Sequence, residues 1–248
     1  MKHASGVRDL DEALSALIVR FGLDAEALAR LRTLLAVLCD DPQAPTAVRD
    51  PRRVLDDHLA DSLVALELHG IRDAREFADI GSGAGLPGLV LAVALPAVSA
   101  CLVESNARKC DFISRTAAAC GLVNVTVVNA RAEAWPAGIG AFELVTARAL
   151  APLPVVAEYG APLLRVGGRL LVWRGRLDSA EDTATARAAS ELGLEMRPPV
   201  RVQPYPQVEH RHLQVLVKTS ATPSRFPRRP GVARKRPLGM FSPPPSDR

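Results

Sequence analysis

The amino-acid sequence predicts an α/β domain built on a mostly parallel β-sheet. The first observation is an apolar run, 77–80, that leads into the glycine-rich segment 81–88 and is followed by the apolar, alanine-rich run 89–95. The order strand, tight turn, helix is that of a βα unit in an open parallel sheet. The second observation is that further strand-like and helix-like segments follow, with links mostly long enough for right-handed crossovers.

The N-terminal part has the hydrophobic pattern of helices. Leucine and isoleucine recur at helical spacing over 7–39, and a Gly-Leu-Asp step divides this stretch into two helices. A proline-containing loop over 40–52 precedes a third helix over 54–69. We therefore expect residues 1–70 to form an N-terminal helical extension.

The central part, residues 71–220, is expected to form a Rossmann-like domain with a seven-stranded sheet. The expected strands are 75–80, 98–103, 124–128, 142–147 and 168–173, followed by two near 194–202 and 211–218. The expected helices between them are 87–95, 107–120, 152–164 and 178–191. A short proline-containing loop joins the last two strands, so we expect an antiparallel pair at the C-terminal edge. Residues 221–248 form a basic tail rich in proline and arginine.

The composition is that of a globular protein. With 248 residues, of which 48% are hydrophobic and 4% aromatic, the chain can bury a sizeable core of Ala, Val and Leu. It has neither a run of 18 apolar residues nor an apolar segment after Met1, so we expect a cytoplasmic protein without a membrane span. The four cysteines lack the pairing of a metal site, so we expect buried thiols and no metal. We also expect a monomer.

The positive charge is concentrated near the C-terminal end. The formal net charge is +4, from 31 Lys and Arg and 27 Asp and Glu residues. Residues 222–248 hold seven of the basic residues and one of the acidic ones, so they carry +6 and the other 221 residues carry −2. This tail is either a disordered end or an arm that contacts RNA phosphates. Phe226 within it would stack on a base or anchor the tail to the domain.

The glycine-rich segment predicts a site for a small ligand. Glycines permit a sharp turn and let backbone N–H groups approach a ligand closely at the start of a helix. Gly83, Gly85 and Gly88 have the spacing of the dinucleotide fingerprint. With Asp79 and Gly81 they form an acid-x-Gly-x-Gly-x-Gly pattern, which resembles motif I of the S-adenosylmethionine-dependent methyltransferases.

A second acidic residue, Glu104, ends the next apolar run, 98–103. It lies about where an acid that binds ribose hydroxyls is expected. An acid both before and after the glycines favours a methyltransferase over an NAD-dependent oxidoreductase, which stays as an alternative. A glycine-rich turn that holds no ligand is the other alternative.

Further stretches of the chain resemble one family. They are Arg49-Asp50-Pro51, Asp57-His58 with Asp61-Ser62, Arg131-Ala132-Glu133, and the runs 146–153, 211–217 and 226–231. Over about residues 30–238, the chain resembles the bacterial 16S rRNA guanine-N7 methyltransferase G family, also called glucose-inhibited division protein B. The resemblance implies a class I S-adenosylmethionine-dependent methyltransferase fold. It also implies methylation of N7 of one guanine in a loop of 16S rRNA, in the small ribosomal subunit or its precursor.

The resemblance also implies the contacts to S-adenosylmethionine. These are expected at Gly81, Leu86, Ala132, Glu133 and Arg148. The general methyltransferase pattern adds Asp79, Gly83, Gly85 and Glu104, the last as acceptor for the ribose hydroxyls. The chain departs from the family pattern at Ala44, Ala147 and Arg174, where Asn, Ser and Lys are usual. Because the missing Asn and Lys bear on the substrate side, a cofactor-bound rRNA-binding or assembly factor with weak catalysis stays as an alternative.

Methylation at guanine N7 requires positioning more than a general base, because N7 already carries an in-plane lone pair. The sequence agrees, since it contains no Pro-Cys nucleophile and no Asn/Asp-Pro-Pro-Tyr/Phe tetrad after the strand 142–147. We predict Arg148 as a catalytic residue that contacts guanine O6 or a phosphate through its planar guanidinium. An ion pair of Arg148 with Glu133 is the alternative.

His58 is the second predicted catalytic residue. It lies three positions before Asp61 on one helical face, where the two side chains would form the floor of the substrate pocket. Capping or pairing within the N-terminal helices is the alternative. For Arg174, an RNA contact and a solvated strand-end charge both stay open, and for Arg211 with His212 we favour a structural role.

Overall fold

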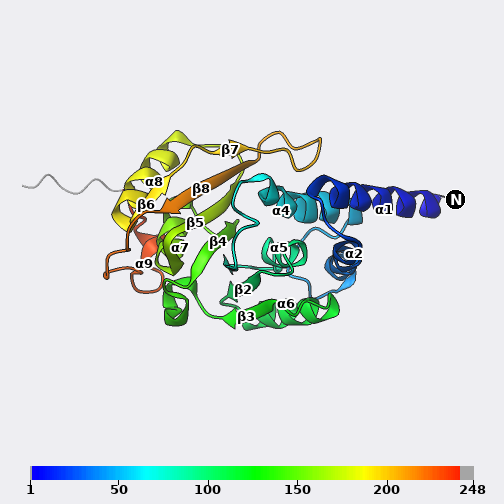
Figure 1. Ribbon diagram of the computed structural model, residues 1–248, viewed down its shortest axis with the longest axis horizontal. Helices are drawn as coiled ribbons and strands as arrows, with labels where there is room; N and C mark the ends of the chain where they lie inside the picture. Colours follow the sequence, from blue (N-terminus) through cyan, green and yellow to red (C-terminus); the bar gives the residue numbers. More distant parts are fainter. Residues whose placement is uncertain (1, 241–248) are drawn as a thin grey trace, which may run out of the picture.

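An eight-stranded sheet forms the centre of the fold in a computed structural model that describes residues 2–240 (Figure 1). The strands are β1 (Glu76–Ile80), β2 (Ser99–Glu104), β3 (Val125–Asn129), β4 (Phe142–Arg148), β5 (Leu164–Arg174), β6 (Leu194–Met196), β7 (Val200–Arg201) and β8 (His212–Lys218). Their order is β3-β2-β1-β4-β5-β8-β6, and β7 also pairs with β8. The first five strands are parallel, whereas β8 is antiparallel to β5, β6 and β7.

Helices cover both faces of this sheet. They are α1 (Lys2–Phe21), α2 (Ala25–Asp40), α3 (Pro51–Val54), the π-helical η1 (Leu55–Ala60), α4 (Asp61–Leu63), α5 (Gly88–Ala94), α6 (Ala107–Ala119), α7 (Leu153–Gly160), α8 (Ser179–Leu192) and α9 (Val232–Lys235). The short 3₁₀ turns are η2 (Val64–Glu67), η3 (Ala132–Ala134), η4 (Pro136–Gly138) and η5 (Ala161–Leu163). One apolar cluster joins the sheet to α1–α6, and a second joins its other face to α7, α8 and α9.

The alternation of side chains along the strands separates these two apolar clusters. In β1, Phe77 belongs to the first cluster, whereas its neighbours Ala78 and Ile80 belong to the second. The strand register brings Asp79 opposite Leu102 of β2 and Thr146 of β4. The carboxyl ends of the central strands therefore meet at one edge, which is where open α/β sheets bind ligands.

The predicted mostly parallel sheet with an antiparallel C-terminal strand is confirmed, but the count of seven strands is wrong. The expected strand over 194–202 is divided into β6 and β7, because Pro198 and Pro199 lie between them. Proline has no backbone N–H and cannot donate to a sheet ladder. The expected helix over 54–69 is helical but irregular, since a π-helical turn and a 3₁₀ turn replace part of its α-helix.

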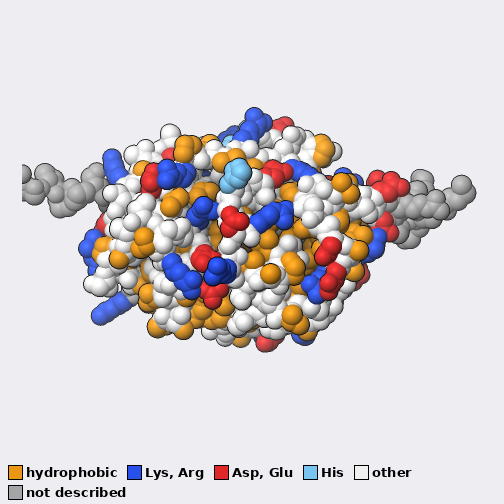
Figure 2. All heavy atoms as spheres, viewed as in Figure 1, with side chains coloured by type: hydrophobic (Ala, Val, Ile, Leu, Met, Phe, Trp, Pro, Cys, Tyr) orange, Lys and Arg blue, Asp and Glu red, His pale blue; other side chains and the backbone are white. Residues whose placement is uncertain are grey.

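The surface carries charges of both signs. On the face shown in Figure 2, Lys and Arg side chains alternate with Asp and Glu side chains around the middle of the molecule. Ion pairs such as Arg115–Asp41 and Arg165–Glu143 join neighbouring elements. No helix within residues 2–240 has both the length and the apolar character needed to cross a membrane.

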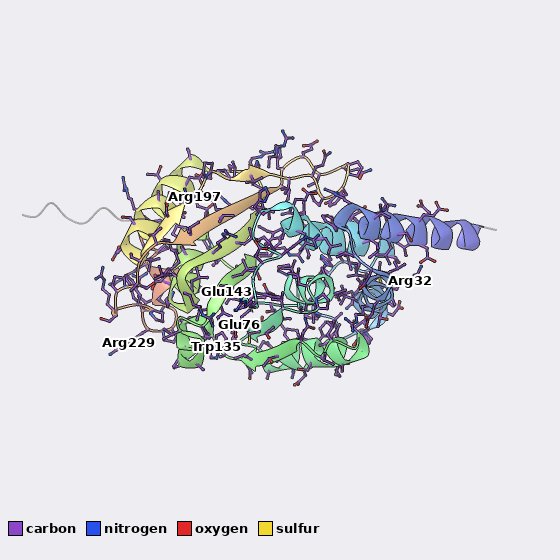
Figure 3. The ribbon with its side chains drawn as sticks, in the orientation of Figure 1. Arg32, Glu76, Trp135, Glu143, Arg197 and Arg229 are labelled. Atoms are coloured by element: carbon purple, nitrogen blue, oxygen red, sulfur yellow. The ribbon has the colours of Figure 1, made fainter. Side chains whose placement is uncertain are left out.

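The C-terminal segment packs against the domain, so the alternative of a disordered end is wrong for residues 221–240. The ring of Phe226 is 7% exposed, which confirms the anchoring alternative for this residue. Arg228 Nε lies 2.7 Å from Glu158 Oε1 of α7, and the Glu158 side chain is 1% exposed. Arg229 lies exposed at the outer rim of the segment (Figure 3). Residues 241–248 of the tail lie outside the described part of the chain.

Replacing Arg228 with Met tests whether this segment belongs to the folded domain. The substitution leaves the buried Glu158 carboxylate without its partner, and we expect the free energy of unfolding to fall by roughly 3 kcal/mol. Arg225→Met is the matched control, because Arg225 pairs with Glu191 at the surface and its loss costs at most about 1 kcal/mol. Urea denaturation measures both, and equal effects would contradict an anchored segment.

Candidate active site

The glycine bend, residues 81–85, follows β1 directly. Gly81, Gly83 and Gly85 have φ angles of 67°, 59° and 83°, a region that residues with a Cβ rarely adopt. A Cβ on Gly81 would also collide with the side chain of Leu150. The N–H groups of Gly81 and Ser82 donate to the carbonyl of Val103 at 2.8 and 3.2 Å, which fixes the bend to the end of β2. The sequence therefore needs glycine at these positions for backbone reasons.

The Asp79 carboxylate lies buried beneath this bend. One of its oxygens accepts a hydrogen bond from the N–H of Gly88 at 3.2 Å, and the other accepts one from the Thr146 hydroxyl at 2.8 Å. The side chain is fully buried, and burial raises the pKa of Asp79 to about 6. Asp79 thus ties the bend to the start of α5 and to β4.

A cleft of about 690 Å³ opens above the bend, at the carboxyl ends of the central strands. Of the residues predicted from the sequence, those that line it are His58, Gly81, Gly83, Leu86, Glu104, Ala132, Glu133 and Arg148. Asp79 and Gly85 are not among its lining residues, and both lie at the bend itself. The structure thus brings most of the predicted site residues to one cavity, and their contacts to a cofactor stay a prediction.

Glu104 ends β2 at the rim of the cleft. Its side chain is largely buried, and it accepts hydrogen bonds from the N–H groups of Gly83 at 3.1 Å and Asn106 at 2.9 Å. Asn106 caps α6, because its side chain accepts from the N–H of Lys109. The carboxylate is therefore held between the bend and the start of α6, with its oxygens at the cavity wall.

Arg148, at the end of β4, is paired with Asp61 rather than with Glu133. Arg148 Nη1 lies 2.9 Å from Asp61 Oδ2 and donates to the carbonyl of Asp57 at 3.2 Å. Asp61 is fully buried, and its other oxygen lies 2.7 Å from Nε of Arg211. The alternative of an Arg148–Glu133 ion pair is wrong, since the helix α4 supplies the carboxylate instead.

His58 faces the same cleft from the π-helical turn η1. Its Nε2 lies 2.9 Å from the Thr46 hydroxyl, while its buried Nδ1 has no hydrogen-bond partner within residues 2–240. Burial, and then the nearby guanidinium of Arg148, lower the pKa of His58 below its usual value. The imidazole is therefore neutral at neutral pH. The two predicted pocket-floor residues separate: His58 lines the cleft, and Asp61 lies behind it.

Comparison with known proteins shows which family this chain belongs to. A family model described as rRNA small subunit methyltransferase G matches residues 34–203, more than half of the chain. The chain belongs to the rRNA small subunit methyltransferase G family. The family predicted from the sequence stretches is thus confirmed.

Individual members of the rRNA small subunit methyltransferase G family align over most of their length. The ribosomal RNA small subunit methyltransferase G of Rubrobacter xylanophilus is 41% identical over 196 residues, which cover 77% of this chain and 75% of that protein. The protein of the same name from Deinococcus radiodurans is 37% identical over 227 residues, 88% of each chain.

Solved structures confirm the predicted fold class. A SAM-dependent methyltransferase from Aquifex aeolicus matches with a TM-score of 0.53 and 14% identity, over 68% of this chain and 94% of that one. A predicted O-methyltransferase from Agrobacterium tumefaciens matches with a TM-score of 0.51 and 21% identity, over 66% and 81% of the two chains. At these identities the comparison establishes the fold alone.

The position of Asp79 distinguishes the two classes of cofactor that the glycines allow. In dinucleotide-binding folds the pyrophosphate lies at the N-terminus of the first helix, on its free N–H groups. In this member of the methyltransferase G family, the N–H of Gly88 at the start of α5 is already bound to the Asp79 carboxylate. A pyrophosphate there would meet a carboxylate, whereas Glu104 and Glu133 along the cleft suit a cationic sulfonium. The residues present fit S-adenosylmethionine and disfavour NAD.

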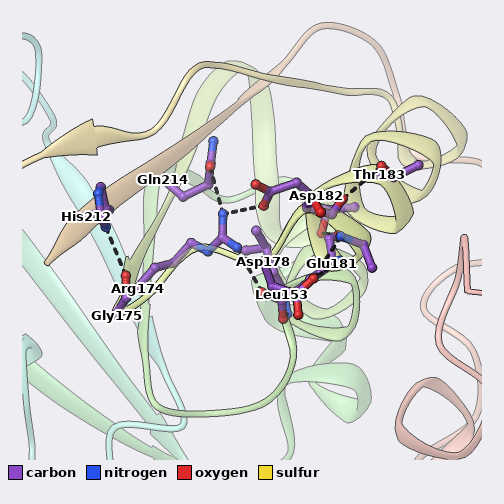
Figure 4. Close-up of polar contacts among 12 residues, drawn as sticks. Leu153, Arg174, Gly175, Asp178, Glu181, Asp182, Thr183, His212 and Gln214 are labelled. Carbon is purple, nitrogen blue, oxygen red and sulfur yellow. Dashed lines mark hydrogen bonds and ion pairs between the residues drawn. The ribbon is translucent and has the colours of Figure 1, made fainter. Parts of the chain in front are cut away.

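Arg174 has neither of the two roles that its position suggested. Its side chain is 5% exposed and points into the domain, where it pairs with Glu181 at 2.9 Å and Asp182 at 2.6 Å (Figure 4). Gln214 accepts a further hydrogen bond at 3.4 Å. It is a buried link between β5 and α8. Its departure from the family pattern therefore does not bear on the substrate side of the cleft.

Seven polar lining residues were not assigned to the site from the sequence. They are Thr46, Ser82, Ser105, Lys109, Arg131, Tyr159 and Arg234. Thr46 and Lys109 lie within a few residues of predicted elements, so proximity to these elements was a usable signal. Tyr159 and Arg234 come from α7 and the C-terminal segment, whose approach to the cleft depends on long-range packing.

The buried Asp79 carboxyl gives a testable dependence of stability on pH. Because its pKa is raised from 3.8 to about 6, the native carboxyl binds a proton at pH values where the unfolded one has lost it. Between these two pKa values, the contribution of Asp79 to the free energy of unfolding falls as the pH rises; it is greatest below this window and constant above it. We therefore expect the free energy of unfolding of wild type, relative to that of Asp79→Asn, to fall by about 2 to 3 kcal/mol across this window.

Urea unfolding of both proteins, measured across and above the same window, provides the comparison. The other titrating groups are common to the two proteins and cancel in the difference. A difference that does not change with pH would show that Asp79 titrates as an ordinary exposed carboxyl.

Proposed function

We propose that this protein transfers the methyl group of S-adenosylmethionine to N7 of a guanine in small-subunit rRNA, in the cytoplasm. The observation that carries the proposal is the acid-lined cleft above the glycine bend in a chain of the rRNA small subunit methyltransferase G family. Asp79 below the bend and Glu104 at its rim provide the two acids that the sequence pattern required.

The cofactor half of the cleft consists of the bend and the ends of β2 and β3. Bound S-adenosylmethionine supplies a methyl group that its sulfonium makes electrophilic. The Glu104 carboxylate would accept hydrogen bonds from the ribose hydroxyls, because the N–H groups of Gly83 and Asn106 hold it in place and each carboxylate oxygen has further acceptor capacity. Ala132 and Glu133 line the cleft beyond β3.

The substrate half lies between Arg148 and His58. Attack by the N7 lone pair forms an N–C bond and breaks a C–S bond, and no proton has to leave. A neutral imidazole at His58 and an Arg148 guanidinium balanced by Asp61 add little net positive charge beside the forming guanine cation. Within residues 2–240 only Nη1 of Arg148 has hydrogen-bond partners, so its other N–H groups can orient guanine O6 or a phosphate. These residues thus bind and orient the base, and none of them acts as a general base.

The partner is best described as a ribonucleoprotein particle. The 221 residues before the tail carry a formal charge of −2, which gives little electrostatic attraction to naked RNA. The small ribosomal subunit or its precursor would present the target loop in a fixed conformation. Catalysis is favoured over a purely assembly role, because the loop that carries Ala44 still contacts the cleft, with the Thr46 hydroxyl 2.9 Å from His58 Nε2.

Replacing Glu104 with Gln tests the proposed cofactor site. The loss of the charged acceptor should raise the Kd for S-adenosylhomocysteine about tenfold, the range for hydrogen bonds to charged groups. Glu195→Gln is the matched control, because Glu195 lies exposed on β6 and pairs with Arg197. Titration calorimetry measures the affinity. An unchanged affinity in Glu104→Gln would contradict the assignment of the ribose site.

Methyl transfer itself is measured with labelled S-adenosylmethionine and small subunits that lack the modification. We expect label at N7 of a single guanine, located by mass spectrometry of the digested rRNA. Binding of S-adenosylhomocysteine without any transfer would favour the assembly factor instead.

A further inference from the structure

The C-terminal strap, residues 225–239, forms part of the cofactor cleft. Phe226 and the Arg228–Glu158 pair anchor it on α7, and Ala233 of α9 is 2% exposed. From α9, the next residue, Arg234, reaches the cavity and lines it. The strap, whose composition is that of a polar tail, therefore places the Arg234 guanidinium at the wall of the cleft.

Arg234 contacts the turn that follows β4. Its Nη2 donates a hydrogen bond to the carbonyl of Leu150 at 3.0 Å. The preceding residue, Ala149, has a φ of 53°. Among the non-glycine residues within 2–240, Ala149 alone has a positive φ. Alanine adopts this left-handed conformation only where surrounding contacts compensate for the strain. The hydrogen bond from a charged donor is such a contact.

This turn connects three parts of the site. Arg148 lies directly before Ala149, so the direction of the turn determines where β4 presents its guanidinium. The Leu150 side chain lies against the Cα of Gly81, in the space that a Cβ would need. Both Ala149 and Leu150 also line the cleft. A shift of the turn would therefore move the wall that faces the glycine bend.

A second contact joins the strap to the opposite wall. The N–H of Gly231 lies 3.4 Å from Oε1 of Glu133, whose side chain is 6% exposed. Glu133 also pairs with Arg131 at 3.7 Å. The strap thus touches the cleft at η3 and at the turn after β4, and it bridges the two sides.

We propose that Arg234 is a positioning residue for cofactor binding. It holds the Leu150 carbonyl and so keeps the strained Ala149–Leu150 turn closed against the glycine bend. The proposal rests on the proposed function, because the cleft must bind an adenosyl cofactor for the closure to matter. Under this proposal, the strap is required for tight cofactor binding and does not serve as an RNA-binding arm.

Substitutions at Arg234 in the full-length chain test this role. Arg234→Met removes the donor and should raise the Kd for S-adenosylhomocysteine about tenfold. Arg234→Lys keeps a charged donor and should stay within about threefold of wild type. Arg229→Met removes a charge from an exposed part of the same strap and should leave the Kd unchanged. Calorimetry gives the affinities, and thermal unfolding without ligand shows whether Arg234→Met still folds.

A second substitution separates positioning from a general loss of structure. Glycine adopts positive φ without strain, so adding Ala149→Gly to Arg234→Met should recover at least threefold of the lost affinity. No recovery in the double variant would overturn the positioning role. Unchanged cofactor affinity in Arg234→Met with weaker binding to small subunits would also overturn it and would make Arg234 an RNA contact.

The same measurements distinguish this proposal from the proposed function. If wild type does not bind S-adenosylhomocysteine, the proposed function fails before Arg234 is considered. If wild type binds it and Arg234→Met binds it equally well, only the role of Arg234 is lost.

Discussion

The Asp79 carboxylate lies where the first strand, the glycine bend, the first crossover helix and the fourth strand converge. It accepts hydrogen bonds from Gly88 and Thr146, and the Ser82 hydroxyl donates to its backbone carbonyl. Burial of this charge is unfavourable, as its raised pKa indicates, yet these contacts give the bend its shape. The carboxylate also occupies the helix N-terminus that a pyrophosphate would need. One buried group thus both builds the cleft and selects the class of cofactor.

The substrate side follows a related principle, in which each buried charge has a partner. Asp61 balances Arg148 and Arg211, and the indole N–H of Trp173 donates to the Asp61 carbonyl at 2.6 Å. Such pairing reduces the cost of burying the arginines. With His58 neutral, these residues would add little net charge beside the guanine that the proposed function places here.

Local sequence patterns predicted the strands, the helices and the glycine bend over which the cleft lies, because glycine spacing and hydrophobic alternation act over short distances. They failed where a partner is distant in the sequence. Arg148 pairs with Asp61 through a contact that only the packing of the N-terminal helices creates. The polar, proline-rich composition of the tail left a disordered end and an RNA-binding arm as alternatives. The buried Glu158 on α7 binds Arg228 and overrides that local preference. The burial of Asp79 beneath the bend, with Thr146 of β4 as a partner, likewise depends on a contact between strands distant in the sequence.

A crystal structure of the protein grown with S-adenosylhomocysteine tests the central claim most directly. The account predicts that the adenosyl group lies over Gly81–Leu86, that both ribose hydroxyls are within hydrogen-bond distance of Glu104, and that Asp79 remains buried and bound to Gly88. A ligand outside this cleft, or a bend that instead accepts the pyrophosphate of NAD with Asp79 displaced, would contradict it.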